Sequence, residues 1–328
     1  MPKFKIVLLL LIFQAYGFTQ VHILDSISKV PVSYATISFG NGNGIFADDE
    51  GKFVFNKKLY PDIDTLYISA LGYKEKTVIR NLLEAEVLLQ PKVDELEEVV
   101  INYELEDNRA YDIEELEPYL DDDYHNCWLP TIESEIAVYF PNPDKNEGKV
   151  SSVLFPIALE SKDWEKRNKK NSDKKKFSTL FKVKFYSSKD GLPHEELTYK
   201  TIVFRATEKD GDFYELDVND YSIKLPQDGL FVSLQVLGYT DANGKLLPNK
   251  KYKEIKTRDG TVKIPTNFRP LLPFTDKIES HNTYIKRVFI NKNEWTLFKK
   301  GYGFKSSLLD KGLYNYGIGL TLKLYKNE

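Results

Sequence analysis

Short segments that alternate apolar and polar residues, separated by turn residues, fill the chain between Val21 and Pro91. Clusters of Asn, Asp and Gly at residues 41–44 and 48–51 are turn signals, because Asn and Asp bond their own backbone and Gly adopts positive φ. Strands this short, at this spacing, are typical of an all-β unit. We therefore expect residues 21–91 to form one small β-sandwich. Its expected strands lie at residues 31–39, 52–55 and 64–73.

The composition favours β structure along the whole chain. The 328 residues include 21 Tyr, 20 Phe and a single Met, and aromatic residues are enriched in strands. Charged residues make up 29% of the chain and the mean hydropathy is -0.42, which is typical of a globular protein with ample core material. A chain of this length has room for two or three domains.

The first residues have the pattern of a secretory signal peptide. Two lysines precede an apolar run at residues 6–13, and Ala15-Tyr16-Gly17 offers the small residues that a signal peptidase requires. The apolar run is too short for a comfortable transmembrane span, and no Cys follows it as a lipid attachment point. We expect residues 1–20 to be a signal peptide for export across the inner membrane, cleaved after Gly17 or Gln20. The alternative is a buried N-terminal strand or helix.

Several spaced residues of the N-terminal segment occur in a recognisable order: Asp25, Pro31-Val32, Ala35-Thr36-Ile37, Gly44, Asp49-x-Gly51-x-Phe53 and Leu66-x-Ile68-Ser69-x-x-Gly72-Tyr73. This order resembles the carboxypeptidase-regulatory-like (transthyretin-like) domain of Bacteroidetes cell envelopes, which also occurs at the N-terminus of TonB-dependent receptors. Residues 96–101 are similar to the segment that often follows that domain. The resemblance implies a β-sandwich in the periplasm or at the outer membrane, and it implies no peptidase activity.

The composition changes sharply after this domain. Between Asp94 and Asp123 there are fourteen Asp or Glu residues and one basic residue, Arg109. An acidic segment of this kind is usually solvated, so we expect residues 92–127 to be an acidic linker. Residues 112–120 are expected to form at most a helical turn or two, and docking of a partner is the alternative role for this segment.

Residues 128–328 return to β patterning. The stretch 180–186 alternates cleanly, so one face of that strand should be buried while the other carries Lys182 and Lys184. Roughly eight strands over this length predict a larger β-sandwich of jelly-roll type. The other expected strands are 135–140, 150–155, 214–218, 221–226, 229–238 and 314–324.

Three segments of this region are also similar to the C-terminal part of secreted flavobacterial proteins of uncharacterised role. They are Phe181-x-Val183-x-Phe185-Tyr186, Leu216-Asp217-Val218-x-x-Tyr221-x-Ile223-x-Leu225-Pro226 and Gly229-x-Phe231-Val232. The resemblance carries over no catalytic residue.

No strong motif for catalysis or for cofactor or phosphate binding occurs in the sequence. Cys127 lies among apolar residues and is expected to be structural rather than nucleophilic. We expect no catalytic residue, no cofactor and no metal site, and the ligand-binding residues stay unknown. The histidines are isolated, without metal-ligand spacing, and are expected to be surface or core residues: His22, His125, His194 and His281.

Two Asp-rich segments raise the question of calcium binding. They are Asp48-Asp49-Glu50 and Asp241-Ala242-Asn243-Gly244. In the second, Tyr252 stands where an EF-hand loop needs a bidentate Glu. We expect both segments to be turns, in which Asp and Asn bond the local backbone.

A basic run at residues 162–176 holds eight Lys or Arg against three acidic residues. Nucleic acid is not the expected partner, because aromatic side chains that could stack on bases are missing apart from Trp164. A loop is expected there, with acidic lipopolysaccharide or the acidic linker as alternative contacts. Trp164 and Trp295 are the candidates for a sugar-stacking surface, although Trp295 is expected to pack in the core.

These patterns together predict a two-domain all-β protein of a bacterial envelope. We expect a binding or scaffolding module without catalytic activity, with an envelope protein or a glycan as its partner and with peripheral association with the outer membrane. One alternative is a hydrolase with paired carboxylates on the C-terminal sandwich. The other is a small outer-membrane β-barrel, for which the alternation at residues 314–324 is suitable.

Overall fold

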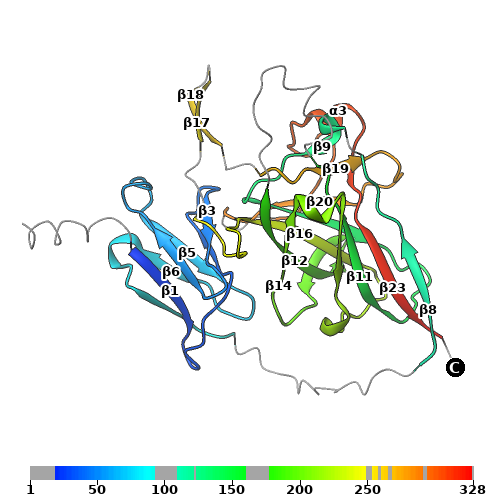
Figure 1. Ribbon diagram of the computed structural model, residues 1–328, viewed down its shortest axis with the longest axis horizontal. Coiled ribbons are helices and arrows are strands. Elements are labelled where there is room, and N and C mark those ends of the chain that lie inside the picture. Colours follow the sequence, from blue (N-terminus) through cyan, green and yellow to red (C-terminus); the bar gives the residue numbers. More distant parts are fainter. Residues whose placement is uncertain are drawn as a thin grey trace, which may run out of the picture. The chain divides into compact units, whose positions relative to one another are not determined.

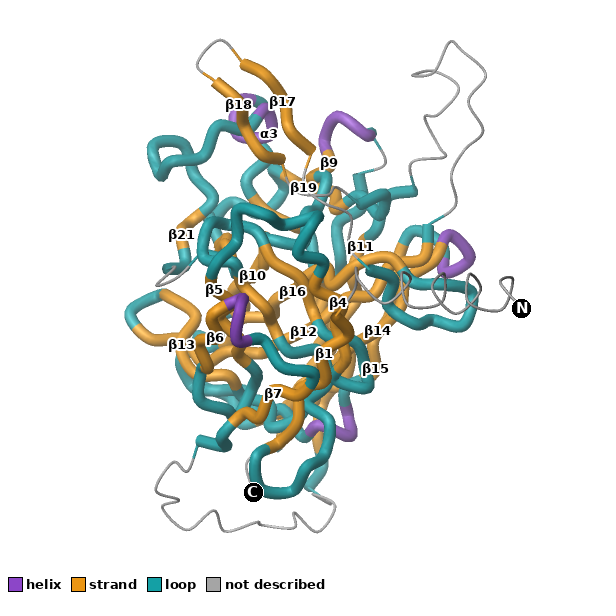
Figure 2. Tube along the Cα trace, turned by 90° about the vertical axis from the view of Figure 1, so that its left-hand side faces the viewer, coloured by secondary structure: helices purple, strands orange, loops and turns teal. Residues whose placement is uncertain are grey.

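The computed structural model describes residues 19–92, 109–121, 123–159, 177–248, 253–257, 260–264, 268–290 and 294–326. Strands dominate these residues, and the helices among them are short turns (Figure 2), so the predicted all-β class is confirmed. The chain divides into an N-terminal unit, residues 1–92 with 248–265, and a C-terminal unit, residues 93–247 with 266–328 (Figure 1). Most of the predicted signal peptide, residues 1–18, lies outside the described residues.

Two sheets form the part of the N-terminal unit that lies within residues 19–92. In the first, β1 (Thr19–Asp25) pairs antiparallel with β4 (Lys52–Phe55) and parallel with β7 (Glu86–Leu89). The second sheet has the strand order β3-β2-β5-β6. Its last strand, β6, is followed in the chain by a single 3-10 turn, η2 (Arg80–Leu82). Its strands are β2 (Thr36–Ser38), β3 (Gly44–Phe46), β5 (Thr65–Ser69) and β6 (Lys76–Ile79).

The two sheets share one hydrophobic core. Phe53 and Phe55 of β4 alternate into it and belong to one cluster of buried side chains with Ile37 and Ile68 of the second sheet. The predicted strand at residues 31–39 is shorter than expected, because regular pairing begins only at Thr36. The arrangement is sandwich-like, since each sheet covers one side of the same core.

The turn at residues 48–51 explains how β4 is placed. Asp48 Oδ1 accepts hydrogen bonds from the backbone N–H of Glu50 and Lys52, at 3.1 and 2.8 Å. Gly51 has a φ of +70°, and a Cβ there would lie 2.7 Å from the carbonyl oxygen of Ile23. The Asp48 segment is thus held as a turn by hydrogen bonds between the Asp48 carboxylate and nearby backbone N–H groups.

A seven-stranded sheet forms one layer of the C-terminal unit, with the order β13-β12-β16-β10-β20-β21 and β14 paired to β12. Residues 219–221 and 208–210 form the 3-10 turns η6 and η5. The sheet's strands are β10 (Ser134–Phe140), β12 (Ser178–Lys189), β13 (Leu192–Glu196), β14 (Ile202–Thr207), β16 (Leu230–Tyr239), β20 (Thr283–Arg287) and β21 (Thr296–Leu297).

A four-stranded sheet of order β15-β11-β23-β8 forms the second layer. Its strands are β8 (Tyr111–Leu116), β11 (Gly148–Pro156), β15 (Phe213–Asp217) and β23 (Gly319–Tyr325). Aromatic rings join the two layers: Phe204 of β14 stacks on Phe155 of β11 and on Tyr214 of β15, at centroid distances of 5.2 and 4.2 Å. The core of this unit therefore lies between the two sheets.

Two smaller sheets complete the described strands. The order β22-β19-β9 joins β9 (Cys127–Trp128), β19 (Leu272–Thr275) and β22 (Asn315–Tyr316). Nearby lie η3 (Tyr124–Asn126), whose contacts include β19, and the short helix α3 (Ser307–Asp310). A separate hairpin consists of β17 (Lys253–Thr257) and β18 (Gly260–Ile264).

The prediction of a linker over residues 92–127 is wrong for its second half. Residues 111–116 form β8, which pairs antiparallel with β23 from the far end of the chain (Figure 1). The helical turn expected at residues 112–120 is therefore absent there. An edge strand tolerates charged side chains because only one of its backbone edges is paired, which explains why an acidic sequence forms a strand. Residues 93–108 lie outside the described residues.

The predicted single strand at residues 314–324 is two strands. Residues 315–316 pair with β19, whereas residues 319–325 pair with β11 and β8. The strand is interrupted near Gly317. The backbone of Tyr119 passes so close to this residue that a Cβ there would lie 2.7 Å from the Tyr119 carbonyl oxygen. The prediction of a strand at 221–226 is also wrong, because this stretch follows the turn η6 and makes only an isolated bridge at Lys224.

Candidate functional site

The outer face of the seven-stranded sheet carries a row of polar side chains, whereas its inner face is apolar. Strand pairing places four residues of four neighbouring strands opposite one another in this row. Residues that pair across strands point to the same face of the sheet. The row consists of Lys182 on β12, Gln235 on β16, Glu135 on β10 and Lys286 on β20.

Glu135 is the centre of this row. It is 1% exposed, and its Oε1 accepts hydrogen bonds from Tyr186 Oη at 2.8 Å and Ser233 Oγ at 2.7 Å. Its Oε2 lies 3.7 Å from Lys184 Nζ. Burial alone raises the pKa of this carboxyl group, but Lys184, Lys286 and the two hydroxyl donors outweigh it, so the pKa of Glu135 lies below its ordinary value. Glu135 is thus an ionised carboxylate whose oxygens are engaged within the sheet.

The pKa values of the two lysines beside Glu135 shift in opposite directions. Burial, with the charge of Lys184 adding to it, lowers the pKa of Lys182 to about 7, against the attraction of Glu135 and Glu196. Burial also lowers the pKa of Lys184, but Glu135 and Glu196 outweigh that effect and raise it above the ordinary value. Burial raises the pKa of Glu196. Two acids and two lysines therefore form one coupled network on this face.

Aromatic side chains cover part of the row. Tyr186 lies on β12, and its side chain extends across β16 to Glu135. Trp295 packs edge-on against the Tyr186 ring at a centroid distance of 5.7 Å. Lys286 Nζ lies 5.6 Å from the centroid of the Trp295 ring. The small side chain of Ala137 is fully buried in the same cluster as the Tyr186 ring. Burial raises the pKa of Tyr186 well above its ordinary value, so its hydroxyl remains a donor.

This burial differs from the sequence-based expectation. Lys182 and Lys184 do lie on the face opposite the apolar core, as the alternation predicted. That face is nevertheless closed, because Lys182 is only 7% exposed. A local pattern cannot reveal that Lys182 is flanked on both sides in the sheet, by Val203 of β14 and Gln235 of β16.

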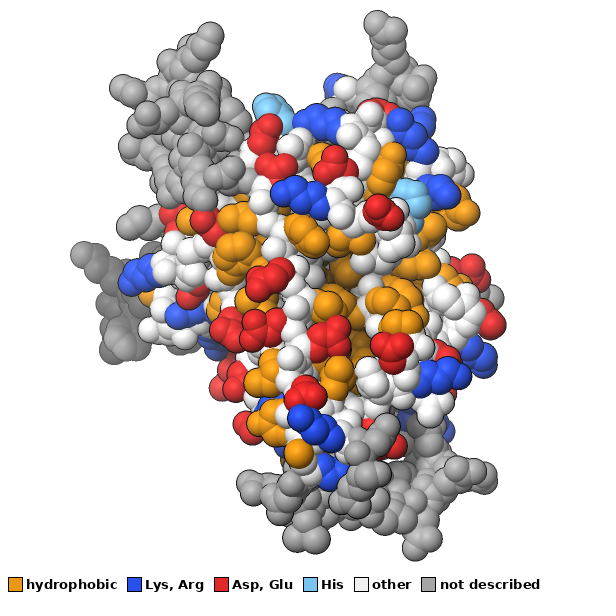
Figure 3. All heavy atoms as spheres, turned by 90° about the vertical axis from the view of Figure 1, so that its right-hand side faces the viewer, with side chains coloured by type: hydrophobic (Ala, Val, Ile, Leu, Met, Phe, Trp, Pro, Cys, Tyr) orange, Lys and Arg blue, Asp and Glu red, His pale blue; other side chains and the backbone are white. Residues whose placement is uncertain are grey.

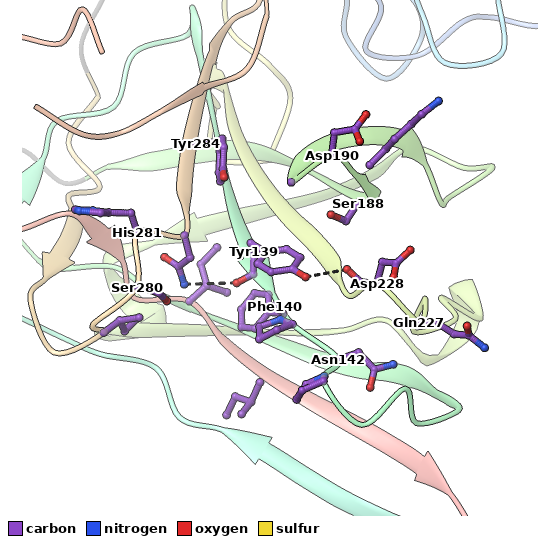
Figure 4. A pocket seen from close by; sticks show the side chains of 18 of the residues that line it. Tyr139, Phe140, Asn142, Ser188, Asp190, Gln227, Asp228, Ser280, His281 and Tyr284 are labelled. Carbon is purple, nitrogen blue, oxygen red and sulfur yellow. Dashed lines mark hydrogen bonds between the residues drawn. The ribbon is translucent and has the colours of Figure 1, made fainter. Parts of the chain in front are cut away.

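An open groove with a volume of about 1210 Å³ lies beside this network, in the C-terminal unit (Figure 4). Its walls come from the ends of β8 and β10, the turn between β12 and β13, and the segments that precede β16 and β20. Figure 3 shows one hollowed face of the molecule, with hydrophobic side chains in the hollow and acidic side chains beside it. The polar and aromatic lining includes Tyr139, Asn142, Gln227, Asp228, His281 and Tyr284.

Hydrogen bonds hold the groove wall in place. Tyr139 Oη donates to the carbonyl oxygen of Asp228 at 2.8 Å, and Asn282 Nδ2 donates to the carbonyl oxygen of Tyr139 at 3.5 Å (Figure 4). Asn142 Nδ2 donates to the carbonyl oxygens of Asn146 and Pro226, at 3.0 and 3.1 Å. The segments that form the groove are therefore tied to one another through side-chain amides and a phenol.

Aromatic contacts connect the groove to the polar row. The ring of Tyr139 packs on Phe231 at a centroid distance of 4.9 Å, and Phe231 meets Tyr284 edge-on at 5.4 Å. Phe231 and Tyr186 belong to one buried cluster. The floor of the groove and the Glu135 network thus rest on the same face of the same sheet.

The predicted histidines do not come together. His125 and His194 are exposed, while His281 lines the groove and has its pKa lowered by burial and by the charge of Lys299. Nδ1 of His281 and Nε2 of His22 are buried without a hydrogen-bond partner among the described residues. Within that part of the chain, no group of three or more His, Cys, Asp or Glu side chains is placed to hold a metal ion.

The remaining sequence candidates lie apart from the groove. Asp241 Oδ1 accepts from the N–H groups of Asn243 and Lys245, both at 2.9 Å, so this segment is a turn like that at Asp48. Cys127 is partly buried, and its Sγ donates to the carbonyl oxygen of Asp123 at 3.3 Å. Trp295 lies on the sheet's outer face rather than in the main core. Trp164 and the rest of the basic run at 162–176 lie outside the described residues.

Sequence reasoning missed the groove residues, because they come from six segments spread along the chain between Leu116 and Ile318. The one local signal was Pro141-Asn142-Pro143, which ends β10 at the groove wall. Among the described helices, none is long and apolar enough to span a membrane. No family model and no curated protein matches the sequence.

Proposed function

We propose that this chain is a binding protein of a bacterial envelope, and that its C-terminal unit holds a glycan in the groove. The observation that carries this proposal is the composition of the groove, in which three tyrosines lie among amide, carboxyl and imidazole side chains. A pocket of this kind orients its ligand through a few polar groups and binds it through apolar surface.

The chemistry of the lining suits a neutral, hydroxyl-rich ligand. Side-chain amides offer both donors and acceptors, which match the hydroxyl groups of a sugar. Tyrosine presents an apolar ring together with a polar tip, which suits the apolar CH faces of a sugar ring. Acidic and basic side chains in the lining nearly balance: Lys145, Lys189, Glu117, Asp190 and Asp228.

The buried carboxylate Glu135 is not suited to a hydrolytic pair. A hydrolytic pair needs carboxyl groups that reach the substrate. Glu135 is 1% exposed, and its Oε1 already accepts two hydrogen bonds from Tyr186 and Ser233. We therefore assign the Glu135 network to the stability of the sheet that supports the groove.

The N-terminal unit supplies the attachment in this proposal. Its resemblance to carboxypeptidase-regulatory-like domains and the signal-peptide pattern of residues 1–20 favour a periplasmic or outer-membrane-associated location. Its two sheets around one core agree with a rigid docking module. In this proposal the unit binds an envelope protein, while the C-terminal unit binds the glycan.

The test is a screen of the purified chain, without residues 1–17, on an array of bacterial glycans, followed by titration calorimetry with the best ligand. Gln227→Ala and Tyr139→Phe should each weaken binding about tenfold, since each removes one hydrogen-bonding group at the groove. The matched controls are Gln90→Ala, an exposed Gln of the N-terminal unit, and Tyr199→Phe, a Tyr that is 70% exposed outside the groove. Equal affinity of groove variants and controls would overturn the proposal.

A further inference from the structure

We infer that the free edge of strand β8 binds an extended, basic segment of another protein as an additional strand. β8 is the last strand in the order β15-β11-β23-β8, and among the described strands it pairs only with β23 (Figure 1). The edge of a sheet presents unpaired backbone N–H and C=O groups, with which a strand of a second chain can pair. Residues 111–115 do not line the groove, so this inference is independent of glycan binding.

The backbone hydrogen bonds of β23 show which groups of β8 point to the free edge. The Lys326 N–H donates to the Ala110 carbonyl oxygen at 2.9 Å, whereas the Tyr325 N–H donates on the β11 side, to the Glu147 carbonyl oxygen at 2.8 Å. In an antiparallel ladder the bonded residues alternate with residues that face away. Within the part of the chain that the structure describes, no hydrogen bond occupies the N–H and C=O groups that face away from β23. They belong to Tyr111, Ile113 and Glu115.

The side chains of β8 leave this edge accessible. Residues 111–115 are all exposed, and Ile113 and Tyr111 are 60% and 44% exposed. Natural edge strands are often blocked by Lys, by Pro or by a bulge. β8 contains neither Lys nor Pro, and its register with β23 runs without a shift. An added strand would therefore find a regular edge, and it would cover the apolar side chain of Ile113.

The acidic side chains of β8 favour a basic strand. Glu114 and Glu115 point to opposite faces of the strand, and neither forms an ion pair within the described residues. Asp112 is already paired, because its Oδ1 lies 2.8 Å from Lys326 Nζ. Opposite charges directly across neighbouring strands are stabilising. Lys or Arg opposite the two glutamates, with a β-branched residue opposite Ile113, is thus the sequence that this edge fits.

A second copy of this chain fits the same edge less well. Antiparallel pairing of two β8 strands around Ile113 would place Glu114 of each copy opposite Asp112 of the other. Like charges directly opposite one another are destabilising, and the symmetry of such a pair would repeat this contact twice. A basic strand of a different protein avoids the repulsion and is the occupant that we infer.

The first test measures the binding of three dye-labelled peptides to the full chain by fluorescence anisotropy. The peptide Thr-Lys-Lys-Val-Thr-Val-Thr, antiparallel to β8, places its two Lys opposite Glu115 and Glu114 and its first Val opposite Ile113. The second peptide has Glu in place of both Lys, and the third carries an N-methyl group on the first Val. The basic peptide should bind at least about tenfold more tightly than either of the others. The second reverses the charge, while the third keeps the charge but lacks a backbone donor.

Variants of the chain locate the peptide. Glu114→Lys should weaken its binding about tenfold. The matched control is Glu215→Lys, an exposed Glu on β15 at the opposite edge of the same sheet, which changes the net charge equally. Ile113→Pro should also weaken binding, since it removes an N–H that faces the free edge and takes no part in the pairing with β23. Thermal unfolding confirms that each variant is folded, and hydrogen exchange should slow at residues 111–115 when the basic peptide is added.

Four results would overturn the inference. They are failure of the basic peptide to bind, equal binding of the basic and N-methylated peptides, and a loss in Glu215→Lys that equals or exceeds the loss in Glu114→Lys. The fourth comes from light scattering of the full chain without peptide. A dimer that Ile113→Pro dissociates would assign the edge to a second copy instead of a basic partner.

Discussion

Tyr186 on β12 donates a hydrogen bond of 2.8 Å to Glu135 on β10, across the intervening strand β16. This contact fixes an aromatic ring over the outer face of the sheet and engages a buried carboxylate at the same time. Loss of the phenol would leave that carboxylate short of one donor in a low-dielectric site. A buried acceptor without its partner costs about 1–3 kcal/mol.

We expect Tyr186→Phe to lower the free energy of unfolding by about 1–3 kcal/mol. Glu135→Ala should cost more, about 3–5 kcal/mol, because it removes the charge that faces the half-buried Lys184 and the buried Lys182. Urea denaturation measures both values, with Tyr199→Phe as the control for loss of an exposed phenol. A Glu135→Ala variant as stable as the parent chain would contradict the role given to this network.

Lys182 gives the stability a predictable pH dependence. Burial lowers its pKa from 10.5 to about 7 in the folded chain, so between these values the unfolded chain binds more protons than the folded one. Stability attributable to this residue therefore rises as the pH increases from about 7 towards 10. Lys182→Met should stabilise the chain at pH 7, because it removes the cost of burying the ammonium group. It should also flatten the slope between pH 7 and 9.

Urea denaturation at several pH values between 7 and 9 measures this difference. The contrast with Lys209→Gln, an exposed lysine, separates the effect of burial from the general effect of net charge. Parallel stability profiles for Lys182→Met and the parent chain would show that Lys182 keeps an ordinary pKa.

Gly229 shapes the groove wall beside Asp228. Its φ is +72°, and a Cβ at this position would overlap the carbonyl oxygen of Phe140. Gly229→Ala should therefore destabilise the C-terminal unit by about 1–3 kcal/mol and displace the segment that carries Gln227 and Asp228. Gly211→Ala is the control, since its φ is also positive at +81° but no atom lies within 4 Å of its Cβ position. Thermal unfolding of the two variants should differ, and equal losses would contradict the steric argument.

The pairing of β8 with β23 predicts slow amide exchange in an acidic segment. Amides of residues 111–116 that bond to β23 should exchange more slowly than those of an exposed turn, because exchange requires the strand to open. Hydrogen exchange followed by mass spectrometry measures this, with the turn at residues 241–244 as the internal reference. Equal exchange in the two segments would restore the original prediction of a solvated linker.

The local patterns predicted the all-β class and the positions of several strands, because alternation of apolar and polar residues indicates which face of a strand is buried. Phe53 and Phe55 face the core as their spacing predicts, and so does the apolar side of β12. β8 was missed because its pairing partner lies about 200 residues away, and its acidic side chains resemble those of a solvated segment.

The candidate site was harder to predict for the same physical reason. The groove brings together Tyr139 of β10, Gln227 before β16 and His281 before β20. These residues line one groove only because the three strands pair in the sheet. Lys182 is buried on a strand that pairs with β14 on one side and β16 on the other, and no local alternation contains these neighbours. The site therefore depends on pairing between strands that are distant in sequence and on the direction of their side chains. Local periodicity predicts only the individual strands.

Hydrogen exchange of the full chain with and without the best array glycan tests the central claim most directly. The account predicts that glycan slows exchange at residues 139–143, 188–191, 227–228 and 278–284, which line the groove, and leaves the N-terminal unit unchanged. Absence of any glycan that binds, or protection confined to segments outside these four, would contradict it.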